Sequence, residues 1–140
     1  MLSINTYLYF TGNAAAAMNY YKSVLGGHFT AQQRYKDMAG GHKMEDEDQE
    51  KIIHIALQVT ANITIMATDL LPSMQMPFNA GNNFHICIQA ENEAEADRLF
   101  AGLSEGGKIE TPLNKTFWGA YFGTCRDQFD VPWMINCEKR

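Results

Sequence analysis

The feature that most constrains the fold of this 140-residue chain is an internal repeat with an offset of 80 positions. Gly26-Gly27 and Gly106-Gly107 are related by this offset, and so are Ala14 and Ala94. In each half a strand-like segment comes first, a helical segment ending at the two glycines follows, and three strand-like segments come last. Because the order of elements repeats along with the residues, the sequence predicts a tandem β-α-β-β-β duplication of the α+β class.

The first module covers about residues 1–69. Strands are predicted over 5–10, 28–36, 51–59 and 62–68, where β-branched and aromatic residues are frequent. A helix is predicted over 14–25, with Asn13 as its N-cap and Gly26-Gly27 as its stop. The acidic run "MEDEDQE" at 44–50 is predicted to be a solvated loop between two strands.

A linker over about residues 70–81, with two prolines and no clear period, separates the first module from the second. The second module covers about residues 82–140. Its predicted strands are 84–90, 108–114, 116–125 and 131–137, and its helix lies within 92–107. Asn92 and Glu95, three residues apart, resemble a capping box at the start of that helix.

Composition narrows the class of protein. The net charge of −5 argues against nucleic acid as a partner, because nucleic acid selects clustered Lys and Arg. The three cysteines form no close pair, which suits reduced thiols. No secretory leader and no apolar run of about 20 residues is evident. We therefore expect a cytoplasmic protein with no membrane partner.

Alternation along the predicted strands assigns the side chains to two faces. The more apolar sets, such as Leu8 and Phe10 in the first strand, are expected to pack under the helices. The opposite faces carry amides, phenols, a thiol and imidazoles, and the offset places Asn5 at the position of His85. A mostly apolar surface on which a few polar groups converge is typical of a small-molecule pocket. The residues predicted to line it are Asn5, Tyr7, His54, Met66, His85, Trp118 and Met134.

Three segments carry a resemblance to a known family: "FWGAYFGTCRDQFDVPWMINC" at 117–137, "GNAAAAMNYYKSVLGG" at 12–27 and "EAEADRLFAGLSEGG" at 93–107. They resemble the PhnB-like family of the vicinal oxygen chelate superfamily, which includes glyoxalase I, bleomycin-resistance proteins and extradiol dioxygenases. The resemblance covers nearly the whole chain, although Asp130 stands where the family usually has glycine. It implies a single domain over residues 1–140 with the glyoxalase/bleomycin resistance/dihydroxybiphenyl dioxygenase fold. In that fold helices lie outside U-shaped mixed sheets, and the chain usually forms a homodimer.

The resemblance also implies a place for a divalent metal ion. Metal-using members of the superfamily have ligands on the first and last strands of each module, which correspond here to Asn5, Met66, His85 and Met134. Only His85 is a good ligand for the divalent ions that such enzymes use, because thioethers suit soft ions and neutral amides bind transition metals weakly. His85 is therefore either a metal ligand or a histidine hydrogen-bonded to a neighbour. His54 either completes a site or is a cavity histidine, and no carboxylate is assigned to the cavity.

Two functions follow from the resemblance. The first is an enzyme of the glyoxalase or dioxygenase type, in which a divalent metal held by His85, with Asn5 and His54, polarises vicinal oxygens of a substrate. The alternative is a protein of the bleomycin-resistance type that binds a drug or toxin without catalysis. Trp118 is either an aromatic wall of the pocket or part of the core. The sequence identifies neither the substrate nor a catalytic residue.

Overall fold

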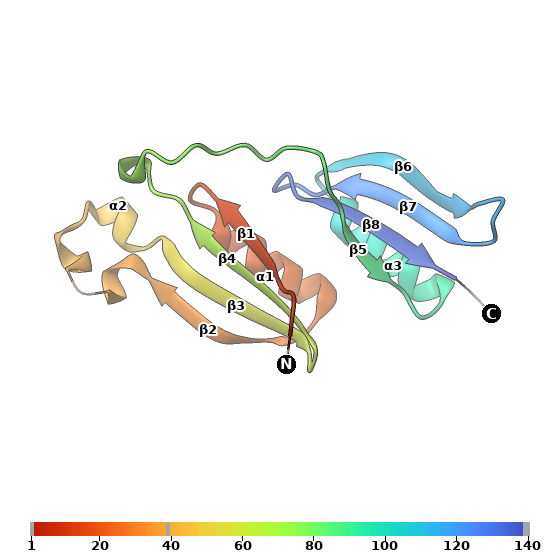
Figure 1. The fold of residues 1–140 in the computed structure, drawn as a ribbon, viewed down its shortest axis with the longest axis horizontal. Helices are drawn as coiled ribbons and strands as arrows, with labels where there is room; N and C mark the ends of the chain where they lie inside the picture. Colours follow the sequence, from red (N-terminus) through yellow and green to blue (C-terminus); the bar gives the residue numbers. More distant parts are fainter. Residues whose placement is uncertain (1, 39, 139–140) are drawn as a thin grey trace. The chain divides into compact units, whose positions relative to one another are not determined.

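The computed structural model describes residues 2–38 and 40–138. The chain forms two compact units, Met1–Phe78 and Asn79–Arg140. Each unit contains one sheet of four strands and one long helix (Figure 1). This arrangement confirms the predicted α+β class and the repeated β-α-β-β-β order.

In the first unit helix α1 (Ala14–Leu25) packs on a mixed sheet. The strands are β1 (Thr6–Phe10), β2 (His28–Arg34), β3 (Ile52–Thr60) and β4 (Ile63–Asp69). Their order in the sheet is β1-β4-β3-β2, with β1 parallel to β4 and the other pairs antiparallel. Single turns of 3-10 helix lie at Tyr35–Asp37, Gly41–Lys43 and Pro72–Met74.

The second unit repeats this topology. Helix α3 (Glu93–Ser104) packs on a sheet made of β5 (Ile86–Gln89), β6 (Lys108–Lys115), β7 (Tyr121–Arg126) and β8 (Pro132–Cys137). The order is β5-β8-β7-β6, with β5 parallel to β8. Tyr7 pairs with Met66 in the first sheet, and Cys87 pairs with Met134 in the second. Residues 80 positions apart, such as Tyr7 and Cys87, therefore occupy equivalent places in their own sheets.

The paired glycines after each helix do more than end it. Gly26 and Gly106 have φ angles of 84° and 74°, which favour glycine. A Cβ on Gly27 would lie 2.2 Å from the Gln58 carbonyl oxygen, and one on Gly107 would lie 2.1 Å from that of Arg126. The second glycine of each pair thus lets the chain pass directly over the backbone of a neighbouring segment.

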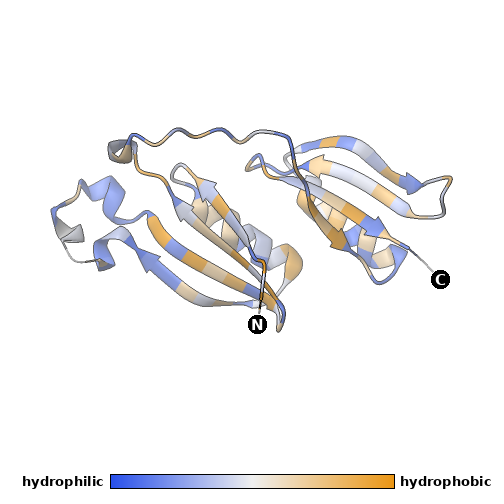
Figure 2. Ribbon diagram, in the orientation of Figure 1, coloured by the Kyte–Doolittle hydropathy of each residue, from blue (hydrophilic) through white to orange (hydrophobic). Residues whose placement is uncertain are grey.

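Alternation predicted the buried faces of the strands correctly in their central parts. The buried residues include Leu8, Phe10, Trp133 and Ile135. Strand β3 shows the expected alternation of hydrophobic and hydrophilic residues (Figure 2). Ile63 and Phe84 were expected to pack but are 52% and 45% exposed. Ile63 is the first residue of β4, and Phe84 precedes β5. The apolar alternation of the sequence therefore extends beyond the part of each strand that packs under the helix.

The structure differs from the prediction in the acidic run and in the strand predicted over 116–125. The acidic run is not simply a loop, because Asp46–Gln49 forms the short helix α2. The strand predicted over 116–125 begins only at Tyr121, since Thr116 and Ala120 close a turn in which the Thr116 hydroxyl accepts the Ala120 N–H at 3.1 Å.

None of the helices in the described chain is long and apolar enough to cross a membrane.

The N-terminus of helix α1 is capped by a residue that is remote in the sequence. The side chain of Asn13 makes no capping hydrogen bond. Instead Asp69, buried at the end of β4, accepts the N–H groups of Gly12 and Ala14 through Oδ1, each at 2.9 Å. In α3 the predicted local cap is present, because Asn92 Oδ1 accepts the Glu95 N–H at 2.8 Å.

Candidate functional site

In the first unit, the sheet face opposite α1 gathers most of the predicted site residues of that unit. Tyr7 on β1 lies beside Met66 on β4, and the Tyr7 hydroxyl is 3.4 Å from Nδ1 of His54 on β3. The Tyr7 ring is also 5.5 Å, centroid to centroid, from the ring of Tyr9. Burial, reinforced by the neighbouring Tyr9 and Tyr35, raises the pKa of Tyr7. Tyr7 is therefore protonated at neutral pH. Asn5 is exposed and lies just before β1.

In the second unit, the sheet face opposite α3 is organised by strand register into two rows. The first row is Cys87, Met134, Thr124 and Thr111, and the second is Gln89, Asn136, Phe122 and Asn114. The Asn136 amide donates to Gln89 Oε1 at 2.9 Å, which joins two of the polar groups of the second row. Burial raises the pKa of the Cys87 thiol, so this face presents a neutral thiol and a thioether between its polar groups.

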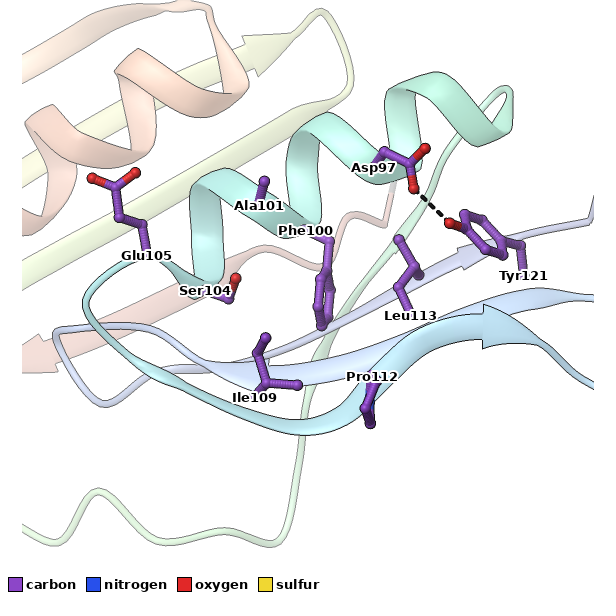
Figure 3. A pocket seen from close by; sticks show the side chains of 9 residues that line it. All are labelled: Asp97, Phe100, Ala101, Ser104, Glu105, Ile109, Pro112, Leu113 and Tyr121. Atoms are coloured by element: carbon purple, nitrogen blue, oxygen red, sulfur yellow. Dashed lines mark hydrogen bonds between the residues drawn. The ribbon is translucent and has the colours of Figure 1, made fainter.

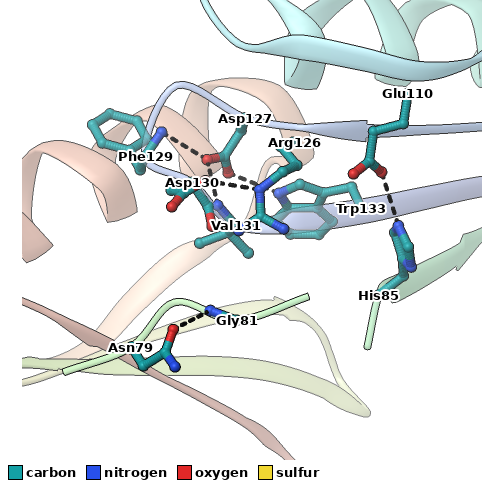
Figure 4. Close-up of polar contacts among 10 residues, drawn as sticks. All are labelled: Asn79, Gly81, His85, Glu110, Arg126, Asp127, Phe129, Asp130, Val131 and Trp133. Atoms are coloured by element: carbon teal, nitrogen blue, oxygen red, sulfur yellow. Dashed lines mark hydrogen bonds and ion pairs between the residues drawn. The ribbon is translucent and has the colours of Figure 1, made fainter. Parts of the chain in front are cut away.

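His85 and Glu110 form a contact that spans this face. Nε2 of His85 lies 3.0 Å from Oε1 of Glu110 (Figure 4). His85 directly precedes β5 and Glu110 lies on β6, which are the two edge strands of the sheet. Three strand spacings amount to about 14 Å, so the two side chains reach toward each other over β8 and β7.

The sequence assigned no carboxylate to this face, whereas the structure brings Glu110 against His85. Simple alternation does not place Glu110, because Pro112 lies on the helix side with Leu113 while Thr111 pairs with Thr124 on the opposite face. The register shift between Ile109 and Thr111 is a bulge, and bulges often re-aim a side chain near a functional site. The approach of the two edge strands depends on how the whole sheet is shaped, which periodicity does not reveal.

Trp118 lies outside the core. It is exposed in the turn before β7, in edge contact with Phe122 at 6.3 Å between ring centroids and with Phe117 at 5.0 Å. Its exposure excludes Trp118 from the core, and its place in a ligand pocket stays a prediction. Trp133, in contrast, is buried and donates its indole N–H to Asp127 Oδ2 at 2.8 Å, so it belongs to the core.

The seven predicted site residues fall into two groups. Asn5, Tyr7, His54 and Met66 belong to the first unit, whereas His85, Trp118 and Met134 belong to the second. Within each unit the strand register brings its members onto or beside one face. Glu110, which contacts His85, is not among the residues predicted from the sequence.

The donor set does not fit a metal centre held by the protein. Among the described residues of the second unit, Glu110 is the one strong donor in contact with His85, and Met134 offers only a thioether. In the part of the chain that the structure describes, no group of three or more His, Cys, Asp or Glu side chains is placed to hold a metal ion. Zinc sites in proteins normally use three or four such ligands.

Two β-α-β-β-β units with matching mixed sheets define the class of protein. Residues 3–135 match the Glyoxalase/Bleomycin resistance protein/Dioxygenase superfamily. The chain belongs to this superfamily, as its resemblance to PhnB-like proteins indicated.

Several relatives are similar over the full length. Protein YjdN from Escherichia coli (strain K12) is 31% identical over 143 residues, covering 99% of this chain and 97% of that protein. The crystal structure of protein PA1353 from Pseudomonas aeruginosa is 37% identical, with a TM-score of 0.88 over 100% of both chains. A PhnB protein from Bacillus cereus is 26% identical, with a TM-score of 0.79 over 97% of this chain and 99% of that one.

Proposed function

We propose that this chain binds a small organic molecule on the face of the second sheet opposite α3, with the His85–Glu110 pair as its polar anchor. The observation that carries the proposal is the 3.0 Å contact between two side chains from opposite edges of one sheet. Such a contact holds an imidazole in a fixed orientation above a surface of thiol, thioether and aromatic groups. A few oriented polar groups on a mainly apolar surface are what small-molecule sites generally use.

The carboxylate determines how His85 meets a ligand. An ionised Glu110 accepts a hydrogen bond, so in the neutral imidazole Nε2 carries the proton and Nδ1 is the acceptor. A ligand hydroxyl or N–H group would donate to Nδ1. Met134 and Phe122 supply apolar surface beside the pair, and Trp118 extends it with an exposed ring. These features favour a planar aromatic ligand with a hydrogen-bond donor.

The first unit offers a second polar group of a similar kind. Tyr7 and His54 lie 3.4 Å apart, with Met66 next to Tyr7 in the sheet. Because the pKa of Tyr7 is raised, its hydroxyl remains a donor across the physiological pH range. We propose that Asn5, Tyr7, His54 and Met66 also contact a ligand.

The alternative is a metal-dependent enzyme of the glyoxalase or dioxygenase type. The chemistry of the donors in the second unit favours binding without metal, because the imidazole of His85 and the carboxylate of Glu110 would have to be completed by the thioether of Met134. The proposal is therefore the binding function of the bleomycin-resistance type.

Thermal unfolding of metal-stripped protein tests the proposal. We expect no stabilisation by Ni²⁺, Zn²⁺, Mn²⁺, Fe²⁺ or Co²⁺, and stabilisation by some planar aromatic compounds that carry a hydroxyl or amide donor. A ligand at 100 times its Kd adds about 2.7 kcal/mol to the free energy of unfolding. The shift should disappear in His85→Ala, shrink in Glu110→Gln and persist in His28→Ala, a control at an exposed histidine of the first unit.

The opposite pattern would overturn the proposal. If a divalent ion stabilises the wild-type protein but neither His85→Ala nor Glu110→Gln, the pair is a metal site and the enzyme alternative holds. If organic ligands stabilise all the variants equally, the anchor has been placed wrongly.

A further inference from the structure

A groove on the other side of the second sheet lies between helix α3 and edge strand β6 (Figure 3). Its volume is about 610 Å³, and it lies wholly within the unit Asn79–Arg140. The lining residues are Asp97, Phe100, Ala101 and Ser104 from α3, Glu105 directly after it, Ile109, Pro112 and Leu113 from β6, and Tyr121 from β7. The groove is separate from the proposed site, because Ile109 faces it while the adjacent Glu110 faces His85.

The floor of the groove is apolar. The Phe100 ring packs against the strands where residue 123 is glycine, since a Cβ there would lie 3.0 Å from Phe100 Cε1 and 2.9 Å from Leu113 Cα. Ile109 remains half exposed because it lies on the edge strand. An apolar floor with an exposed rim suits a ligand that has an apolar body.

The two ends of the groove are acidic. Asp97 lies on α3 and Glu105 directly follows the last residue of that helix, and the eight residues between these two lining positions correspond to about 12 Å along the helix axis. Both are exposed, and among the described residues no Lys or Arg lines the groove. Glu93, one turn before Asp97, is already paired with Lys115 at 2.9 Å. Asp97 and Glu105 are therefore the charges that a ligand would meet.

Tyr121 holds one of these carboxylates in place. Its hydroxyl donates to Asp97 Oδ1 at 2.6 Å, and this bond, together with burial, raises the pKa of Tyr121 to about 12. Because the phenol donates to Oδ1 only, the second oxygen of Asp97 can face a cation.

An added peptide strand is not the favoured occupant. Pro112 lies within β6, where it removes one backbone N–H from the edge, and the register shifts twice along the strand. Proline and bulges are features that protect an edge strand against pairing.

We propose that this groove binds a linear organic cation with an ammonium group at each end and an apolar body, such as an α,ω-diaminoalkane. The two ammonium groups would pair with Asp97 and Glu105, and the methylene chain would lie on Phe100, Ile109 and Leu113. An extended eight-carbon diamine matches the spacing of the two carboxylates.

Titration of 15N-labelled protein with 1,8-diaminooctane, n-octylamine and 1,4-diaminobutane tests this proposal. We expect 1,8-diaminooctane to bind most tightly and to shift the amide signals of Ala101, Ser104, Ile109 and Leu113. Its affinity should fall with added salt, since both ends are exposed ion pairs. Equal affinities for the diamine and n-octylamine, or shifts confined to other residues, would overturn the proposal.

Substitutions distinguish the contribution of the two carboxylates to binding from that of the shape of the groove. Asp97→Asn and Glu105→Gln should each weaken binding of 1,8-diaminooctane by about 1.5- to 5-fold, as expected for exposed ion pairs. Ala101→Lys, at an exposed helical position between them, should abolish it while leaving distant amide signals unchanged. The matched control Glu91→Gln removes one negative charge outside the groove and should bind like wild type. If Glu91→Gln weakens binding as much as the groove variants do, the cation responds to net charge and the site does not exist.

Discussion

Asp130 shows how a single residue departs from the pattern of the family. It adopts a φ angle of 70°, in the left-handed region that favours glycine, and PhnB-like proteins usually have glycine there. The Arg126 guanidinium bonds Asp130 twice, at 2.7 Å to Oδ1 and at 2.8 Å to the backbone oxygen. Aspartate tolerates this conformation better than most residues, and the Arg126 pair helps to hold it.

Substitutions at this residue should separate backbone strain from the ion pair. Asp130→Gly loses the side-chain bond to Arg126 but relieves the strain, so we expect a stability close to that of wild type. Asp130→Ala loses the bond and keeps the strain, and should be less stable than Asp130→Gly by roughly 1–2 kcal/mol. Urea denaturation measures both variants. Equal stability of the Ala and Gly variants would show that the left-handed conformation is not maintained in solution.

At the scale of elements, Asp69 joins three segments that are distant in sequence. Oδ1 accepts the N–H groups of Gly12 and Ala14 at the start of α1, and Oδ2 accepts the Ile52 N–H at the start of β3, all at 2.9 Å. The Tyr35 hydroxyl donates to the backbone oxygen of Asp69 at 2.8 Å. One buried carboxylate at the end of β4 thus positions both the helix and the strand that carries His54.

Removing this carboxylate should destabilise the first unit strongly. Asp69→Ala leaves three backbone N–H groups without their acceptor, and we expect a loss of at least about 3 kcal/mol in the free energy of unfolding. Asp69→Asn retains one acceptor oxygen and should lose less. Asp46→Ala, an exposed acidic control on α2, should change stability by less than about 0.5 kcal/mol. A loss for Asp69→Ala no larger than that of the control would contradict this role.

At the scale of the whole molecule, the described chain leaves several large apolar side chains in solvent. In the first unit Leu2 and Ile4 are 89% and 90% exposed, and in the second unit Phe117 is 98% exposed beside the exposed ring of Trp118. Groups of exposed apolar residues often mark surfaces that bind another protein. Together with the resemblance to a family that usually forms homodimers, they lead us to propose that this chain is a homodimer.

Sedimentation velocity tests the homodimer. We expect wild-type protein at micromolar concentration to sediment as a dimer, and Leu2→Ser/Ile4→Ser/Phe117→Ser to shift toward monomer because less apolar surface is buried on association. Ile63→Ser, at an exposed apolar residue outside this set, is the control and should remain dimeric. A monomeric wild-type protein would contradict the proposal.

Local features of the sequence determined much of this structure. The offset of 80 predicted the repeated topology, because each module must bury one helix face on one sheet. Alternation placed Tyr7 and Met134 opposite the helices, because side chains of a strand point to alternate faces. The Asn92 cap was predictable because it involves residues only three positions apart.

Contacts between segments distant in sequence were decided only by the tertiary structure. Asp69 rather than Asn13 caps α1, because the end of β4 meets the start of the helix in space. The turn at Thr116–Ala120 shortens a strand that periodicity extended, and it leaves Trp118 exposed. Glu110 meets His85 because the bulge in β6 and the shape of the sheet bring the side chains of two edge strands together. Periodicity assigns each residue to a face, whereas partners across a sheet depend on how several strands pack and twist together.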